Sequence, residues 1–276
     1  MIEIPEAQVV AKQVNDTVVG KKVAHVTVGH TPHKFAWFCG DPQNYPALLS
    51  GKTVAGSGGY GSMVEIRTES AVLLFGDGVA LRYHPQEIRP PKHQLLIEFT
   101  DGTALSASVQ MYGGLWCFRE GEFDNGYYKV AKEKPAPLSA PFDPTYFNGL
   151  LVAAAETKLS AKAFLATEQR IPGLGNGVLQ DILWTARIHP KRKINTFSGR
   201  EQKALFDSVK TVLADMTRMG GRDTEKDLLG KAGGYKTAMS KNNTGTPCPV
   251  CGGFIKKENY LGGSIYYCEV CQMPTV

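Results

Sequence analysis

The sequence predicts an α+β protein of several units: an N-terminal helix with a β-sandwich, a helical domain, and a small terminal hairpin held by cysteines. Three observations predict this. Short β-type segments crowd residues 52–120, apolar residues recur at helical spacing after residue 143, and four of the six cysteines fall within residues 246–272. The length of 276 residues allows one large domain or two to three small ones.

Composition and charge limit the class of protein. Hydrophobic residues make up 42% and charged residues 21% of the chain, as in ordinary globular proteins. The sequence lacks an unbroken apolar run of about 18–20 residues, and its start carries Glu3 and Glu6 instead of a signal peptide. We therefore expect a cytoplasmic protein with no membrane partner.

The net charge of +5 is unevenly distributed. Residues 1–150 hold 13 Lys and Arg against 15 Asp and Glu, a balance of −2, whereas residues 151–276 hold 18 against 11, a balance of +7. A basic half indicates either a polyanionic partner such as nucleic acid or a solvated basic surface.

The first half of the chain reads as a helix followed by many short strands. Residues 6–20 predict the helix and residues 21–29 a first strand. Strands are then predicted at 62–68, 71–75, 79–84, 94–100 and 104–109, separated by the turn signals "GDG" (76–78), a proline-rich link (89–91) and "DG" (101–102). So many short strands indicate a sandwich or a barrel.

A proline-rich segment, residues 132–144, predicts a linker between domains. The predicted division is therefore a β-sandwich domain over 1–131, the linker, a helical domain over 145–240, and a cysteine unit over 241–276. In the helical domain, residues 145–159, 160–168 and 201–219 have apolar residues at helical spacing.

A glycine-rich turn, "IPGLGNG" (171–177), joins two predicted helices, the second of which starts near Gly177. The glycines allow close approach of the backbone, and the free N–H groups of a helix start attract an anion. Asn176 can donate to the same anion, and basic residues follow at 187–193. Alone, such a stretch is more often a simple turn.

Cys248, Cys251, Cys268 and Cys271 form two Cys-x-x-Cys pairs separated by sixteen residues. This spacing predicts one structural Zn²⁺ bound by four thiolates with no open position, and a reducing compartment disfavours the alternative of disulfides. The residues between the pairs predict a β-hairpin whose bend the glycines and Asn259 supply, and which needs the metal to fold.

These residues carry a resemblance to a known family. "IPGLGNGVLQDILWTARIHP" (171–190) resembles the helix–two-turn–helix of the formamidopyrimidine-DNA glycosylase / endonuclease VIII family. The terminal four-cysteine hairpin and the opening "EIPEAQ" are similar to the zinc finger and the acidic N-terminal motif of that family, and the order of units also matches.

The resemblance implies base excision repair of duplex DNA that contains a damaged base or an abasic site. The damaged base is flipped out and cut from its sugar. In the family, an N-terminal proline attacks C1′ as a secondary amine and forms a Schiff base, the adjacent glutamate transfers a proton, and elimination then nicks the strand. We expect a monomer that is associated with the nucleoid.

The chain departs from the family at three functional positions. Position 2 is Ile2, so Met1 should be retained and its primary amine would take the place of the proline. There is no lysine between Lys52 and Lys92, and "RTES" (67–70) stands roughly where the family has its hairpin lysine. A glycine in "LGGSIYYC" (261–268) takes the place of the zinc-hairpin arginine.

The predicted catalytic residues are Glu3, Glu6 and Met1, and Glu3 has alternative roles. Glu3 could activate water for base release without nicking, or it could only cap the first helix. The protein could also have kept DNA binding and lost the chemistry, or be a zinc-ribbon module for protein or RNA.

The predicted DNA contacts are Lys162, Gly175, Asn176, Gly177, Lys191, Arg192, Lys256 and Lys257. Three further residues could fill the space left by the flipped base, unless they are core residues: Gln110, Met111 and Tyr112. Tyr83 or His84 is a further candidate for this last role.

Overall fold

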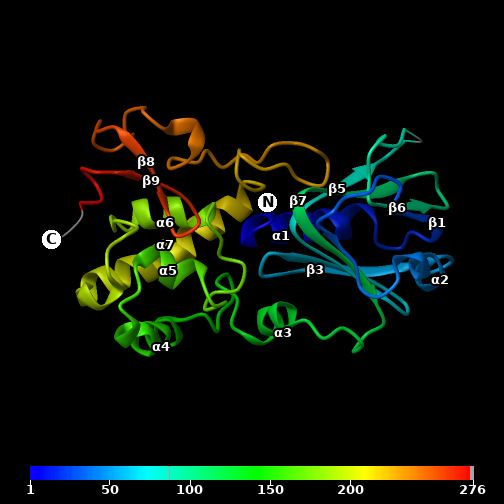
Figure 1. The fold of residues 1–276 in the computed structure, drawn as a ribbon, viewed down its shortest axis with the longest axis horizontal. Helices are drawn as coiled ribbons and strands as arrows, with labels where there is room; N and C mark the ends of the chain where they lie inside the picture. The colour runs from blue at the N-terminus through cyan, green and yellow to red at the C-terminus, as the bar shows by residue number, and fades with distance from the viewer. Residues whose placement is uncertain (87, 274–276) are drawn as a thin grey trace.

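The computed structural model describes residues 1–86 and 88–273 and contains a β-rich part and a helical part that meet at the N-terminal helix (Figure 1). The β-rich part consists of α1 (Ile4–Thr17), β1 (Val23–Val28), β2 (Ala36–Trp37), α2 (Tyr45–Leu49), β3 (Val54–Tyr60), β4 (Met63–Thr68), β5 (Val72–His84), β6 (Leu95–Phe99), β7 (Ala104–Phe118) and α3 (Gly126–Glu133). The helical part consists of α4 (Pro144–Ala154), α5 (Ala161–Ala166), α6 (Val178–Thr185) and α7 (Gly199–Arg218), and the terminal hairpin of β8 (Ile255–Tyr260) and β9 (Gly263–Cys268). The predicted α+β class with a terminal hairpin is confirmed.

The strands form one continuous, sandwich-like sheet in the order β1-β6-β7-β5-β4-β3, with β2 paired to β7 in parallel. Alternate residues of β5 face opposite sides, as the pleat requires. Leu73 and Phe75 join the large core under α1, while Val72 and Leu74 join a smaller core under α3. The sheet is therefore covered by helices on both faces.

Two strands differ from the prediction. The segments predicted as separate strands at 71–75 and 79–84 form the single strand β5, because "GDG" makes a bulge there and Asp77 takes φ of 59°. Strand β3 was not predicted, because its glycines have low strand propensity. Gly59 is needed for close packing, since a Cβ there would lie 2.9 Å from the backbone of Ala7 in α1.

The helical part has its own core, to which Ile4 of α1 also belongs. Helix α7 begins with a capping box, in which Ser198 and Glu201 satisfy each other's backbone N–H groups. Helix α5 ends at Ala166, earlier than predicted, and α6 begins at Val178 directly after Gly177, as predicted. Among the described residues, no helix is both long and apolar enough to cross a membrane.

The segment after α7, residues 220–235, crosses from the helical part to the sheet (Figure 1). Leu228 is fully buried in the large core of the β-rich part, and its carbonyl oxygen accepts a hydrogen bond from the Tyr83 N–H at 2.9 Å. We call residues 220–235 the crossing segment. It links the two parts a second time, besides the chain between α3 and α4.

The terminal hairpin has a two-residue turn, Leu261–Gly262, in which both residues have positive φ. Gly262 confirms that a glycine supplies the bend, whereas Asn259, also predicted there, lies within β8, so that detail was wrong.

Candidate active site

The N-terminus of the chain projects into a cavity of about 200 Å³. The Ile2 side chain is buried in the large core, and its N–H donates to the Asp77 carbonyl oxygen at 3.0 Å. Met1 is 44% exposed, and its α-amine forms an ion pair with the Glu225 carboxylate. The cavity is lined by Met1, Ile2, Glu6, Val10, residues 78–82, Gln110 and residues 224–226. An α-amine at the wall of a cavity can act as a nucleophile toward a bound ligand once it has lost a proton.

A buried ion cluster fixes the residues next to this amine. Arg222 of the crossing segment donates from Nε to Glu6 Oε1 at 2.9 Å and from Nη2 to Glu6 Oε2 at 2.7 Å. The Arg222 Nη1 atom also lies 3.6 Å from Glu3 Oε1, and Nη2 donates to the Met1 carbonyl oxygen at 3.3 Å. All three side chains are at most 7% exposed. The first turn of the chain is therefore tied to the far end of the helical part.

Glu3 holds the start of α6. Its two carboxylate oxygens accept hydrogen bonds from the N–H groups of Gly177 and Val178, each at 2.8 Å. The sequence predicted that these N–H groups would face an external anion such as a DNA phosphate. They bind the Glu3 carboxylate of the same chain instead, so the predicted phosphate contact of Gly177 is wrong.

Close packing explains the glycines of this turn. A Cβ at Gly177 would lie 1.6 Å from Arg222 Nη1, and one at Gly175 would lie 2.7 Å from Glu3 Oε1. Gly175 therefore makes room for Glu3. In the described structure the α-carbons of both glycines face the chain's own ion cluster.

Burial and neighbouring charges shift the pKa values of these groups in opposite directions. Burial raises the pKa of Glu3, although Arg222 opposes this. Burial acts to raise the pKa of Glu6 as well, but the charge of Arg222 and its hydrogen bonds prevail and lower the pKa of Glu6. At the cavity wall, burial lowers the pKa of Arg82, opposed by Asp227 and Glu225. Glu6 is thus held as a carboxylate beside a permanent cation.

The predicted DNA contacts of the helical part divide into two groups. Asn176 donates from Nδ2 to the Ser264 carbonyl oxygen at 2.9 Å, and Lys162 donates from Nζ to the Tyr260 carbonyl oxygen at 2.5 Å. A Cβ at Gly263 would lie 3.4 Å from Lys162 Nζ. The structure therefore brings Asn176 and Lys162 together at the turn of the terminal hairpin.

The remaining basic residues are mostly paired. Lys191 forms an ion pair with Glu258, and Lys256 forms one with Glu269. Arg192 donates to both carboxylate oxygens of Glu201, and its side chain is only 12% exposed, so it braces the start of α7. Lys257 is exposed on β8.

Three residues of β7 lie beside the cavity. Gln110 lines it, and Met111 is 65% exposed, so Met111 is not a core residue. Tyr112 is half-buried, and its ring packs at 5.6 Å from that of Trp37. Tyr83 is half-buried against the large core and His84 donates to or accepts from Ser106 Oγ at 2.8 Å. Among the candidates for a protruding wedge, Gln110 and Met111 are exposed, whereas Tyr112, Tyr83 and His84 are half-buried.

The turn that reaches the helical part is Gly61–Ser62, between β3 and β4. A Cβ at Gly173, whose φ is +79°, would lie 2.1 Å from the Gly61 carbonyl carbon, so the two turns are in contact. Residues 67–70, where the sequence placed the counterpart of the family's basic turn, form the next turn of the sheet, between β4 and β5. Of these two turns, the one that contains Ser62 lies beside the helical part.

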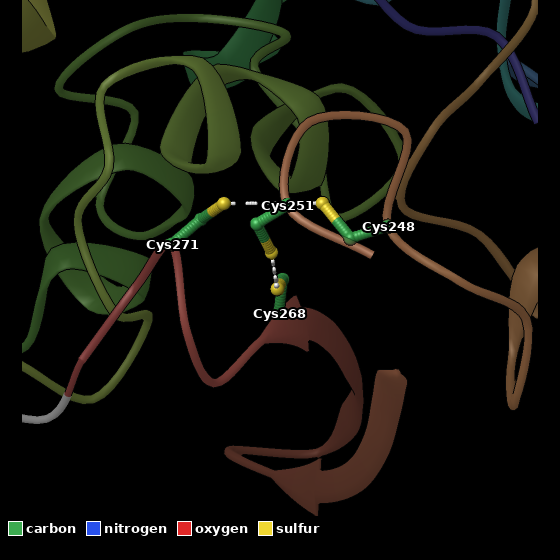
Figure 2. A group of neighbouring side chains, drawn as sticks. All are labelled: Cys248, Cys251, Cys268 and Cys271. Atoms are coloured by element: carbon green, nitrogen blue, oxygen red, sulfur yellow. Dashed lines mark hydrogen bonds between the residues drawn. The ribbon is translucent and has the colours of Figure 1, made fainter. Parts of the chain in front are cut away.

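The four cysteines of the terminal hairpin converge (Figure 2). Their sulfur atoms all lie within 4.8 Å of one another, with Cys251 and Cys268 Sγ atoms 3.4 Å apart and Cys248 and Cys271 Sγ atoms 3.9 Å apart. Four thiolates around a tetrahedral Zn²⁺ at 2.3 Å would lie about 3.8 Å apart. Gln272 supports the group, since its Oε1 accepts from the Cys268 N–H and its Nε2 donates to the Ile188 carbonyl oxygen. The donor set fits one metal ion.

Sequence reasoning missed Arg222, Glu225 and Leu228, which all lie in the crossing segment. Their signal in the sequence was weak. Arg222 and Glu225, for example, contact residues that lie more than 200 positions away in the chain. The glycine pairs at 220–221 and 233–234 marked only an irregular stretch.

Comparisons with known proteins agree with this architecture. The formamidopyrimidine-DNA glycosylase N-terminal domain matches residues 1–110, and the formamidopyrimidine-DNA glycosylase H2TH domain matches residues 134–227. Formamidopyrimidine-DNA glycosylase of Bacillus anthracis is 26% identical over 279 residues, and that of Lactobacillus delbrueckii subsp. bulgaricus is 28% identical over 285; each alignment covers 99% of both chains.

Solved structures are similar over the whole chain. Lactococcus lactis Fpg in complex with DNA that contains an abasic site has a TM-score of 0.85 and 23% identity, and MutM (Fpg) of Thermus thermophilus has 0.81 and 21%. Each comparison covers 99% of this chain and 100% of the other. The fold and site thus define a helix–two-turn–helix protein with an N-terminal β-sandwich and a terminal cysteine hairpin. The chain belongs to the formamidopyrimidine-DNA glycosylase family.

Proposed function

We propose that the protein is a DNA N-glycosylase that removes a damaged base from duplex DNA in base excision repair. The observation that carries this proposal is the amine of Met1 at the wall of a cavity that α1, β5, β7 and the crossing segment enclose. Membership of the family supports it, and related structures from Lactococcus lactis contain DNA with an abasic site or a Fapy-dG lesion. A zinc-ribbon module for protein or RNA would not account for this cavity.

For the reaction we propose attack by the Met1 amine. The neutral amine adds to C1′ of the damaged nucleotide, the bond from C1′ to the base breaks, and its electron pair leaves with the base, which takes up a proton. The added nitrogen loses a proton, and the C1′–O4′ bond breaks with protonation of O4′, which leaves an iminium at C1′. Loss of a C2′ proton from this iminium allows elimination of the 3′ phosphate, so strand nicking follows base release.

Glu3 then acts by position. Both of its oxygens already accept backbone N–H groups, and Glu3 is absent from the residues that line the cavity in the described structure. This arrangement favours amine attack over activation of a water molecule by Glu3. We propose that Glu3, Arg222 and Glu6 hold the N-terminal turn so that Met1 faces the flipped nucleotide.

We propose that DNA lies across Asn176, Lys162 and the hairpin turn. Asn176 and Lys162 bring side-chain donors to one place, and the basic excess of residues 151–276 supplies the general attraction for phosphate. The hairpin must be rigid to bind DNA at this position, but so short a hairpin buries too little apolar surface to be rigid by itself. One structural Zn²⁺ bound by Cys248, Cys251, Cys268 and Cys271 would make it rigid. Such a protein would work as a monomer in the bacterial cytoplasm, in association with the nucleoid.

The test is a panel of lesion duplexes assayed separately for base release and for nicking, with borohydride added to trap an iminium. We expect base release from at least one lesion and a covalent adduct that mass spectrometry maps to Met1. A variant with one serine added before Met1 moves the amine and should lose the adduct while it still binds the duplex. Base release without an adduct would refute amine attack, and binding without base release would refute the glycosylase.

A further inference from the structure

We infer that Glu225 is the catalytic proton acceptor for the Met1 amine, an inference that rests on the proposed function. The Glu225 carboxylate is in direct contact with the α-amine, and both groups line the same cavity. The Glu225 side chain is 28% exposed, so it is open to the cavity and is not part of a core.

The crossing segment holds Glu225 in place from both sides. On one side is Arg222, which is fixed by Glu6. On the other side the Leu228 N–H donates to Gln13 Oε1 at 3.0 Å, and Gln13 Nε2 donates to Asp227 Oδ2 at 2.8 Å. Leu228 itself is fully buried in the sheet core. Glu225 lies three residues from each anchor, so its carboxylate has little freedom to leave the amine.

The proposed chemistry requires a base at this position. A protonated amine has no lone pair and cannot attack C1′, so one proton must leave nitrogen before the C–N bond forms. Glu225 takes that proton and becomes a neutral carboxylic acid. The acid returns this proton to the departing base. The regenerated carboxylate then takes the second proton from the added nitrogen and passes it to O4′, so both protons that nitrogen loses are accounted for without another reactant.

Other carboxylates near the N-terminus are already engaged. Glu3 accepts two backbone N–H groups, and Glu6 accepts from Arg222 and from the Glu3 N–H. Glu225 carries the carboxylate that contacts the amine. The charged groups that face it are Arg82 from β5, Glu6 from α1, and Arg222 and Lys226 from the crossing segment.

The test compares Glu225→Gln with wild type in single-turnover borohydride trapping on a lesion duplex. Loss of a general base predicts a 10²–10⁴-fold slower rate at pH 7. The difference in rate should become smaller at a pH of about 9.5, where hydroxide from solution can take the proton in place of the carboxylate. DNA affinity, measured by fluorescence anisotropy, should stay within about threefold. Glu69→Gln, in an exposed turn of the sheet, is the matched control and should trap at the wild-type rate.

Two further variants keep the inference falsifiable. Glu225→Asp retains the carboxylate and should trap faster than Glu225→Gln at pH 7. If Glu225→Gln fails to fold, as judged by circular dichroism, Glu225→Ser with added formate replaces it, and formate should restore the rate. Equal trapping by wild type and Glu225→Gln at both pH values would overturn the role of Glu225. That outcome leaves the glycosylase intact, whereas no base release by wild type on any lesion overturns the proposed function itself.

Discussion

Replacement of Arg222 by Met should destabilise the protein by about 3–5 kcal/mol, the usual cost of removing one partner from a buried ion pair. Arg222 is 3% exposed and makes two side-chain hydrogen bonds to Glu6, at 2.9 and 2.7 Å. Methionine fills similar space but leaves Glu3 and Glu6 as two buried carboxylates without a cation. Glu3 keeps its two N–H donors, so most of the cost falls on Glu6.

Equilibrium unfolding in urea, followed by circular dichroism, measures this change. With a slope of about 3 kcal/mol per M, the midpoint should fall by roughly 1 M or more. Arg218→Met is the matched control, because its side chain is 71% exposed and its pair with Asp215 should contribute less than about 1 kcal/mol. A second change, Glu6→Gln, in the Arg222→Met background should recover part of the loss.

The pH dependence gives an independent check. Arg222 lowers the pKa of Glu6 below its ordinary value of 4.5, so this stabilisation is present above pH 4.5 and is lost as the pH falls through the lowered pKa. In Arg222→Met the unpaired carboxyls protonate readily instead, so the gap between variant and wild type should narrow on acidification. If Arg222→Met and Arg218→Met unfold within about 1 kcal/mol of each other, the ion cluster does not hold the two parts together.

Three further predictions concern other contacts. Cys268→Ser should abolish binding of one Zn²⁺, measured with a chromophoric chelator, and should weaken duplex binding at least tenfold while the helical circular dichroism is kept. Gly173→Ala should lower the stability in thermal unfolding more than Gly220→Ala does. Both residues have φ near +80°, and an alanine in this conformation alone costs about 1–3 kcal/mol of stability. Only the Cβ at Gly173 would also meet backbone atoms, at 2.1 Å. Equal costs would argue against close contact of the two turns. Leu228→Ala should lower the free energy of unfolding by about 2–5 kcal/mol and slow base release. Leu229 is 45% exposed, so Leu229→Ala should do neither. If Leu228→Ala behaves like wild type, the crossing segment is not held in place by Leu228.

Local patterns in the sequence were sufficient for the features that depend on neighbouring residues. The spacing of Cys248 to Cys271 predicted a four-sulfur group, and the structure brings the four sulfur atoms together. The start of α6 at Gly177 followed from the glycine-rich turn. Each of these rests on residues less than about 25 positions apart, so spacing alone defines the geometry.

Features that depend on distant partners could not be predicted in this way. The Glu6–Arg222 contact spans 216 residues, and its two local sequences contain no pattern that relates one to the other. The same limit applies to β3, whose three glycines oppose a strand until β4 pairs with it and α1 packs over Gly59. Likewise, "GDG" is a turn signal by itself and becomes a bulge only because β7 pairs on both sides of it.

The Glu3 carboxylate at the start of α6 connects this helix to the N-terminus of the chain. A helix start with free N–H groups suits a phosphate, and the sequence alone pointed to DNA. Occupation by Glu3 instead makes α6 part of the active-site framework, because the residue that caps the helix is two positions from the amine. In the proposed mechanism Met1 is retained, which would move that amine one residue beyond the family's proline, past buried Ile2 and toward the crossing segment. Glu225 contacts the amine there, so in the proposed mechanism the change at position 2 and the carboxylate at position 225 act together.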